Sequence, residues 1–353
     1  MKEKTLLRID RDRLAKQLHP TEQAGDSPAN KGLPHRTVSK PRNVTEWSPW
    51  PSSSDFGKKV NPSWNKDDFH PQLNQTYACE DSCIVSRIIA KADTWISCGD
   101  DGLIKKFNTD LSNFETIGRH NAFAAGASFL GTDRLVTSSG DGELKVWNLD
   151  APGETCILSL RKEHHACVWS VDVLGDYAIT GSLDHSAKLI DLNIGKCKHA
   201  YRAHVDSVNK SIFVSNSSII TGSADKSVSL WDLRTANCVS TSFSHSSVVN
   251  DISACGDLVA SCDMSASLVL FDLRSNRLGS PLARTSLPSS INTVTWLSRN
   301  TVCVGCKDGT IVTVSSDGSI INSFPTTCNV LSIAVNHHSL MTADADGFIK
   351  SWF

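Results

Sequence analysis

The 353-residue sequence has no long apolar run and almost no net charge. No apolar stretch reaches the roughly 20 residues of a membrane-spanning helix. The first residues, MKEKTLLRIDRDRLAKQL, lack the apolar core of a secretory signal, so the sequons at Asn43 and Asn74 carry little weight. The formal charge of −2 excludes an overall field that would attract nucleic acid. We expect neither a membrane nor a nucleic-acid partner.

Catalytic motifs are missing as well. The sequence contains no P-loop, no G-x-S-x-G and no dinucleotide fingerprint. His164 and His165 follow Glu163 without forming H-E-x-x-H. Cys303 and Cys306 form a C-x-x-C, but no second pair or nearby His completes a zinc set, and on a strand the two thiols point to opposite faces. We expect no catalytic residue, metal, cofactor or small-molecule substrate.

The twelve cysteines lack the spacing of a disulfide framework. Many of them lie inside apolar, strand-like runs. Together with the missing secretory signal, this pattern predicts reduced, buried thiols in a cytoplasmic protein.

What the sequence does contain is an internal repeat. Small residues, a turn Asp and an alternating strand recur seven times, with the turn positions 38 to 43 residues apart. A period near 40 is typical of about four strands per repeat. The turn positions are Asp101, Asp141, Asp184, Asp225, Ser265, Asp308 and Asp346.

These repeats, over roughly residues 72 to 353, resemble the WD40 family, which forms β-propellers. The resemblance implies an all-β, seven-bladed propeller. It also implies a hydrogen-bonded chain within a blade, in which a His, a hydroxyl, the turn Asp and a Trp satisfy one another's polar groups. Blades 2 and 4 contain the full set: His120, Thr137, Asp141 and Trp147, and His204, Thr221, Asp225 and Trp231.

Other blades depart from this set. Blade 3 has Ile190 at the Trp position, and blade 5 has Ser265 and Phe271 at the Asp and Trp positions. Blades 1, 6 and 7 lack the His. We therefore expect blades 2 and 4 to be the stiffest.

The last repeat ends at its third strand, so its outer strand must come from elsewhere. The stretch TYACEDSC (Thr76 to Cys83) aligns with YRAHVDSV (Tyr201 to Val208), which contains the end of an outer strand. We therefore predict that Gln72 to Ala78 forms a strand that pairs with the last blade. Such pairing closes the ring and removes an exposed sheet edge.

The first 70 residues show no sustained period and are rich in Pro, Ser and Lys. We predict two parts, an irregular, extended tail at residues 1–70 and a propeller at residues 71–353. The tail contains three of the nine tryptophans, so we expect it to pack on something. It either wraps along its own propeller or docks on a partner. Its aromatic residues are Trp47, Trp50, Phe56 and Trp64.

The WD40 resemblance also indicates a binding face. In the family, the residue after the first apolar position of the first strand often points to the entrance of the central channel. Here these residues are Trp169, Asn209, Asn250 and Asn292. A Trp beside three amides suits an extended peptide. The alternative is that the asparagines cap local turns.

Blades 4 and 5 are similar to those of the sperm-associated antigen WD-repeat family of the axonemal central apparatus. The similar stretches are YRAHVDSVN, TGSADKSVSLWDLRTANC and LVASCDMSASLVLFDLR. This resemblance implies a non-catalytic scaffold among microtubule-associated or axonemal subunits. It places the protein at the cytoskeleton or the cilium axoneme.

A second resemblance concerns WDLR and FDLR, which end at Arg234 and Arg274. Tandem ends of this type resemble substrate receptors of cullin-4 ubiquitin ligases. The two arginines would then face an adaptor protein. The alternative is that each arginine pairs with a local carboxylate.

Overall fold

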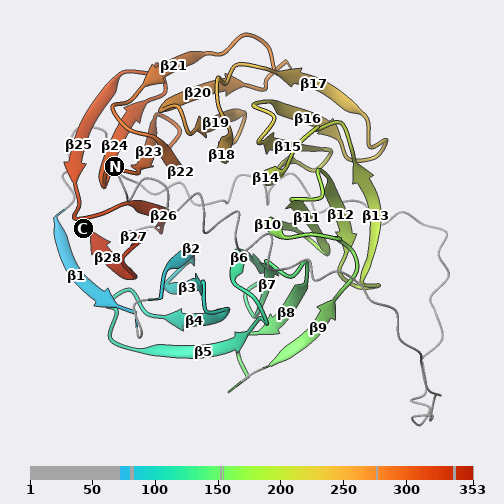
Figure 1. The fold of residues 1–353 in the computed structure, drawn as a ribbon, viewed down its shortest axis with the longest axis vertical. Helices are drawn as coiled ribbons and strands as arrows, with labels where there is room; N and C mark the ends of the chain where they lie inside the picture. The colour runs from blue at the N-terminus through green and yellow to red at the C-terminus, as the bar shows by residue number, and fades with distance from the viewer. Residues whose placement is uncertain are drawn as a thin grey trace, which may run out of the picture. The chain divides into compact units, whose positions relative to one another are not determined.

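The computed structural model describes residues 72–352, apart from 80–82, 152, 154, 276, 337 and 338. These residues form 28 strands, arranged as seven four-stranded antiparallel sheets. Figure 1 shows the sheets as blades around a common axis. The prediction of an all-β, seven-bladed propeller is confirmed. The described residues include no helix of the length and hydrophobicity that a membrane crossing needs.

The first four blades follow one another along the chain. Blade 1 is β2 (Val85–Lys91), β3 (Thr94–Gly99), β4 (Leu103–Phe107) and β5 (Phe114–Arg119). Blade 2 is β6 (Ala124–Leu130), β7 (Arg134–Ser139), β8 (Leu144–Asn148) and β9 (Cys156–Leu160). Blade 3 is β10 (Val168–Leu174), β11 (Tyr177–Ser182), β12 (Ala187–Asp191) and β13 (Lys196–Tyr201). Blade 4 is β14 (Val208–Ser215), β15 (Ser218–Ser223), β16 (Val228–Asp232) and β17 (Cys238–Ser242).

The remaining blades continue in the same order, except that the last one takes its outer strand from the start of the described chain. Blade 5 is β18 (Val249–Cys255), β19 (Leu258–Asp263), β20 (Ser267–Asp272) and β21 (Ala283–Ser286). Blade 6 is β22 (Ile291–Ser298), β23 (Thr301–Cys306), β24 (Thr310–Ser315) and β25 (Ile320–Pro325). Blade 7 is β26 (Val330–Val335), β27 (Leu340–Asp344), β28 (Phe348–Trp352) and β1 (Leu73–Ala78).

Burial within a blade follows from its position between two neighbours. Every side chain of β15 beyond its first residue is buried, because the adjacent blades cover both faces of the middle strands. The outer strand β17 is mostly exposed. Between blades, apolar side chains interlock. The Trp147 ring of blade 2 packs against Ile96, Ile104 and Ile117 of blade 1. Gly118 makes room for that ring, because a Cβ there would lie 2.1 Å from it.

The ring closes as predicted. β1 pairs antiparallel with β28, with Tyr77 opposite Ile349 and Leu73 opposite Trp352. Figure 1 shows the blue β1 beside the red β28. The Tyr77 ring also stacks on Phe114 of blade 1, with ring centroids 3.7 Å apart. The closing strand therefore holds together the first and last blades.

Several predictions about the tail lie outside the described residues. They concern the division at residue 70 and the aromatic residues Trp47, Trp50, Phe56 and Trp64. These stay predictions.

Candidate functional site

Blade 4 contains the complete polar chain that the resemblance implied. His204 Nδ1 donates to Asp225 Oδ2 at 2.9 Å, and its Nε2 lies 2.7 Å from Thr221 Oγ1. Trp231 Nε1 donates to the same hydroxyl at 2.8 Å. These hydrogen bonds connect the loop before β14 to the turn after β15, so they fix two segments that no strand pairing joins.

Blade 3 contains the same His–Asp link without the Trp. His164 Nδ1 donates to Asp184 Oδ2 at 2.8 Å, and its Nε2 lies 2.7 Å from Thr180 Oγ1. Burial by itself would raise the pKa of Asp184, but the hydrogen bond and charge of His164 outweigh it and lower that pKa. Ile190 fills the Trp position and is fully buried.

Blade 2 differs from the expected set. His120 Nε2 lies 2.7 Å from Thr137 Oγ1, which also accepts from Trp147 Nε1 at 2.8 Å. The His120–Asp141 hydrogen bond is not made. Asp141 Oδ1 accepts from the Glu143 backbone N–H at 3.0 Å, a bond that the turn Asp of blades 3 and 4 also makes. Two of the three links of the predicted chain are therefore present.

Blade 5 corrects a sequence interpretation. The turn residue Ser265 suggested that this blade lacks its carboxylate, but Asp263, at the end of β19, supplies it. His245 Nδ1 donates to Asp263 Oδ2 at 3.0 Å, and Ser265 Oγ donates to Asp263 Oδ1 at 2.8 Å. Burial alone would raise the pKa of Asp263, but the hydrogen bonds from His245, the Ser267 backbone N–H and Ser265 lower it to about 2. The His–carboxylate link thus belongs to blades 3, 4 and 5.

One face of the ring is defined by strand register. In blade 4, Val208 at the start of β14 lies opposite Ser223 at the end of β15, and Val228 opposite Ser242. The loop entering a blade and the turn between its second and third strands therefore lie on the same side. We call the side formed by these loops and turns the top face.

The three predicted asparagines of the top face link neighbouring blades. Each side-chain amide donates to the carbonyl of the first residue of the next blade: Asn209 to Val249 at 2.9 Å, Asn250 to Ile291 at 2.6 Å and Asn292 to Val330 at 2.8 Å. They link blades 4 to 7 to one another on the top face. The alternative, that the asparagines cap local turns, holds in part for Asn209, because its side-chain oxygen also accepts from Ser207 Oγ of its own blade at 3.0 Å. The binding role of the asparagines stays a prediction.

Trp169 belongs to an aromatic pair on the top face. It is half-buried in blade 3, and its ring centroid lies 5.7 Å from that of Phe123, in the loop entering blade 2. Phe123 in turn lies over Gly140, where a Cβ would come within 2.3 Å of its ring. Sequence reasoning missed Phe123, because only the packing brings this loop residue to Trp169.

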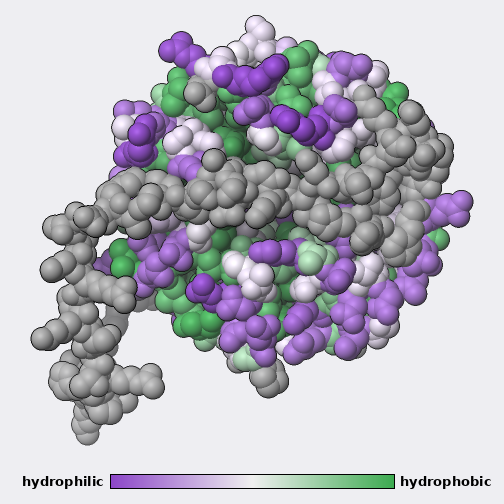
Figure 2. Space-filling model, turned by 180° about the vertical axis from the view of Figure 1, so that it is seen from behind, coloured by the Kyte–Doolittle hydropathy of each residue, from purple (hydrophilic) through white to green (hydrophobic). Residues whose placement is uncertain are grey.

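Large exposed apolar side chains occur on the top face of blades 4 and 5. Val205 is 80% exposed, Phe243 76% and Met264 40%. Val205 and Phe243 lie in the loops that enter blades 4 and 5, and Met264 lies in the turn after β19. Other exposed apolar side chains, such as Ile157, Ile194 and Ile320, lie on outer strands or on the opposite side of the ring. On the face seen in Figure 2, apolar residues are interspersed with polar ones.

Charged side chains cross the centre of the ring. Asp251 of blade 5 lies 2.9 Å from Lys210 Nζ of blade 4 and 3.6 Å from Arg87 Nη1 of blade 1. Figure 1 shows β2, which carries Arg87, across the axis from β14 and β18. Burial would raise the pKa of Asp251, but Lys210 and Arg87 lower it. Burial lowers the pKa of Lys210.

Arg234 and Arg274 each pair with the carboxylate two residues earlier. Arg234 Nη2 lies 3.3 Å from Asp232, and Arg274 Nε lies 2.8 Å from Asp272. Their side chains are 62% and 77% exposed. They follow the third strands of adjacent blades, on the side opposite the top face.

The cysteines do not form a reactive pair. Cys303 and Cys306 are buried in different apolar clusters, on opposite faces of β23 as predicted. Burial raises the pKa of both thiols, that of Cys306 to about 12. The expectation of buried thiols is wrong for Cys156 and Cys238, which are exposed.

Comparisons with known proteins agree with this geometry. Residues 154–191 and 195–232 match the family described as "WD domain, G-beta repeat". The solved WD40 β-propeller domain of Doa1 has a TM-score of 0.73 with this chain, covering 81% of it and 97% of the Doa1 chain at 20% identity. Two of its repeats match the WD40 family, and its fold is that of a WD40 β-propeller.

Relatives of this WD40 propeller carry varied names. The WD repeat-containing protein pop2 of Schizosaccharomyces pombe is 30% identical over 22% of this chain and 10% of its own length. Polyadenylation factor subunit 2 of Neurospora crassa is 25% identical over 50% of this chain and 27% of its own. The human peroxisomal targeting signal 2 receptor is 35% identical over 22% of this chain and 25% of its own length. The chain thus spans a tenth to about a quarter of these relatives.

Proposed function

We propose that this WD40 propeller is a non-catalytic scaffold that binds a partner protein through its top face. The supporting observation is the exposure of Val205, Phe243 and Met264 on two neighbouring blades. Apolar side chains left in water on one face gain free energy when a partner covers them. The proposed occupant is an extended segment of the partner, because the loops of the top face present separate apolar side chains on the same face as the Trp169–Phe123 pair.

The interior of the ring supports a scaffold rather than an enzyme. Its central strands carry the ion network of Arg87, Lys210 and Asp251, whose charges are already paired. The buried histidines of blades 3, 4 and 5 are likewise bonded within their blades. Each of these groups has a structural role, so we expect the surface to carry the function.

A surface test separates top-face binding from general stickiness. The double variant Val205→Ser with Phe243→Ser should lose partner proteins in quantitative affinity capture. The matched control is Ile194→Ser, because Ile194 is 68% exposed but follows the third strand of blade 3, on the other side of the ring. If the double variant and the control retain the same partners, the top face is not the binding surface.

We further propose that the assembly is a microtubule-associated one of the central-apparatus type, at the cytoskeleton or cilium axoneme. The support is the sequence likeness of blades 4 and 5. The relatives reported above are named for other processes. Localisation of the tagged protein in a flagellated cell tests this, and a protein that is absent from the flagellum contradicts it.

The tail offers a second test of the same assembly. We expect a variant with Trp47, Trp50 and Trp64 changed to Ala to melt like the wild type but to leave the insoluble cytoskeletal fraction. Each ring can contribute roughly 1.5–3 kcal/mol by burial against a partner, before the cost of ordering the segment. A variant that stays bound removes the tail as a docking arm, and one that melts early makes it an intramolecular wrap.

The alternative function is that of a cullin-4 substrate receptor. It is supported by the exposed guanidinium groups of Arg234 and Arg274 on adjacent blades. An adaptor would have to compete with their local carboxylates. Capture of the ligase adaptor by the wild type, and its loss when both arginines are changed to Ala, would favour this function over the axonemal one.

A further inference from the structure

One histidine of the repeated polar chains lacks the carboxylate that the others have. His164, His204 and His245 each donate from Nδ1 to an Asp at 2.8–3.0 Å. In blade 2, His120 is only 1% exposed, yet its Nδ1 has no hydrogen-bond partner among the described residues. A buried imidazole nitrogen without a partner is costly, which suggests that a ligand completes it.

Blade 2 also differs from blades 3 and 4 at the position two residues after the turn Asp. Blades 3 and 4 have Ser186 and Ser227 at this position, and each donates to the Asp of its own blade. Blade 2 has Glu143 instead, which is 2% exposed. Among the described residues, its Oε2 also accepts no hydrogen bond, and the Lys145 Nζ atom lies 3.8 Å from it. A second carboxylate therefore stands where blades 3 and 4 have a hydroxyl.

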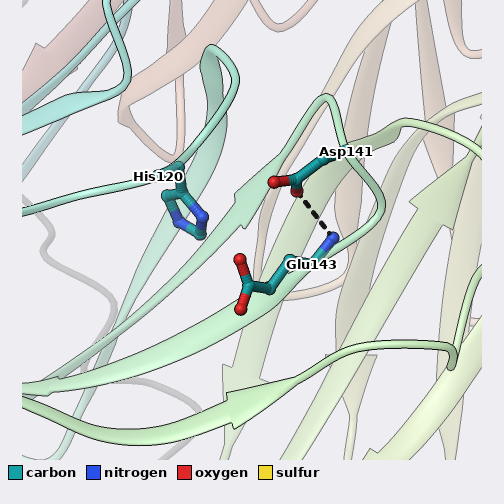
Figure 3. Close-up of side chains that lie close together, drawn as sticks. All are labelled: His120, Asp141 and Glu143. Carbon is teal, nitrogen blue, oxygen red and sulfur yellow. Dashed lines mark hydrogen bonds between the residues drawn. The ribbon is translucent and has the colours of Figure 1, made fainter. Parts of the chain in front are cut away.

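The two carboxylates and the histidine converge. One ligand atom from each of His120, Asp141 and Glu143 lies within 4.8 Å of the others. Figure 3 shows the imidazole and both carboxylates directed toward a shared space. Thr137 holds His120 Nε2 at 2.7 Å, which turns Nδ1 toward this space. A hydrogen bond that orients the second ring nitrogen is the usual support of a metal-binding histidine.

We propose that His120, Asp141 and Glu143 bind a divalent transition-metal ion, best matched by Zn²⁺. One imidazole nitrogen and two carboxylate oxygens are ligands that Zn²⁺ accepts, with the fourth position left to water or a partner. The imidazole argues against Ca²⁺ and Mg²⁺, which prefer oxygen alone. Binding at about 2 Å requires the three atoms to draw closer, and Asp141 is an exposed turn residue that can move inward.

The charges around the site set its strength. Arg161 Nε donates to Glu143 Oε1 at 2.9 Å, and Ser159 Oγ donates to the same oxygen, so Oε2 remains for the metal. Lys145 Nζ donates to the Arg119 carbonyl at 2.9 Å. Two cations near the site weaken binding of a third. Arg161 is 66% exposed, so removing its charge should strengthen Zn²⁺ binding without disturbing the blade.

The test uses the purified full chain, stripped with EDTA and titrated with Zn²⁺ in a calorimeter. We expect one strong equivalent in the wild type, at least 100-fold weaker binding in Glu143→Ser and tighter binding in Arg161→Gln. Glu143→Ser installs the residue of blades 3 and 4, so it should fold. Glu115→Ser, which removes an exposed carboxylate of blade 1, is the matched control and should bind like the wild type.

Twelve cysteines make thiolate binding the main competing explanation. Co²⁺ distinguishes the two, because thiolate ligands give an intense charge-transfer band that nitrogen and oxygen ligands lack. We expect a Co²⁺ spectrum without this band, and loss of the Co²⁺ signal in Glu143→Ser. A strong thiolate band, unchanged binding by Glu143→Ser, or a wild type that binds no Zn²⁺ would each overturn the proposal.

Discussion

The substitution Asp251→Asn tests what holds the centre of the ring together. Asp251 is 3% exposed and pairs with Lys210 and Arg87, while its Oδ2 also accepts from the Thr293 hydroxyl and the Val294 backbone N–H. Asn preserves the shape but removes the charge, so the buried Lys210 ammonium loses the counter-ion that lies 2.9 Å from it. Breaking one partner of a buried ion pair costs about 3–5 kcal/mol.

That loss is large compared with the total free energy of unfolding. A typical domain is stable by about 5–15 kcal/mol, so Asp251→Asn should lower the urea midpoint markedly and the melting temperature by roughly 10 °C. Asp251 also has a lowered pKa. Its contribution is therefore present above the ordinary carboxyl pKa and is lost as pH falls through the folded-state value. Urea unfolding followed by circular dichroism measures both effects.

A double-mutant cycle shows whether the pair itself is responsible. Changing Asp251 to Asn and Lys210 to Met together should recover much of the loss, because the buried ammonium is then removed as well. Arg87 remains, but its side chain is 26% exposed. The control is Asp133→Asn, whose carboxylate is 53% exposed and 3.9 Å from Arg134. If Asp251→Asn costs less than about 1 kcal/mol, or if the two changes simply add, the central network does not stabilise the ring.

Three further predictions concern the blades. Deleting residues 1–80 should lower the urea midpoint of the whole propeller, because it removes β1, whereas deleting 1–45 should not; equal midpoints would contradict closure by β1. Asp225→Ala should cost about 1–3 kcal/mol in a denaturation series by orphaning a buried histidine, and more than Asp308→Ala, whose blade has no such chain. Asp263→Asn should cost about 2 kcal/mol at pH 7, a deficit that shrinks as the wild type loses stability from about pH 4 toward pH 2; parallel pH profiles would refute the role of Asp263.

Much of the fold could be predicted because short, repeated sequence patterns determine it. Each repeat carries its own turn residues and alternating strands, and seven copies near a 40-residue period leave few other architectures. The closing strand was also predictable, since Thr76 to Cys83 aligns with a stretch that ends another outer strand. Hydrophobic period and turn chemistry act between residues close in sequence, so a single chain reveals them.

The tertiary structure alone decided which polar groups meet. Ser265 stands at the turn position, yet Asp263 reaches His245. The top-face asparagines were predicted to bind a peptide, and only the structure shows that each also donates to the next blade, as Asn209 does to Val249. His120 was predicted to belong to a complete polar chain, but its Nδ1 makes no hydrogen bond to Asp141, and Glu143 lies beside it. A hydrogen bond depends on a few tenths of an ångström between atoms on different strands and blades, and only packing sets that distance.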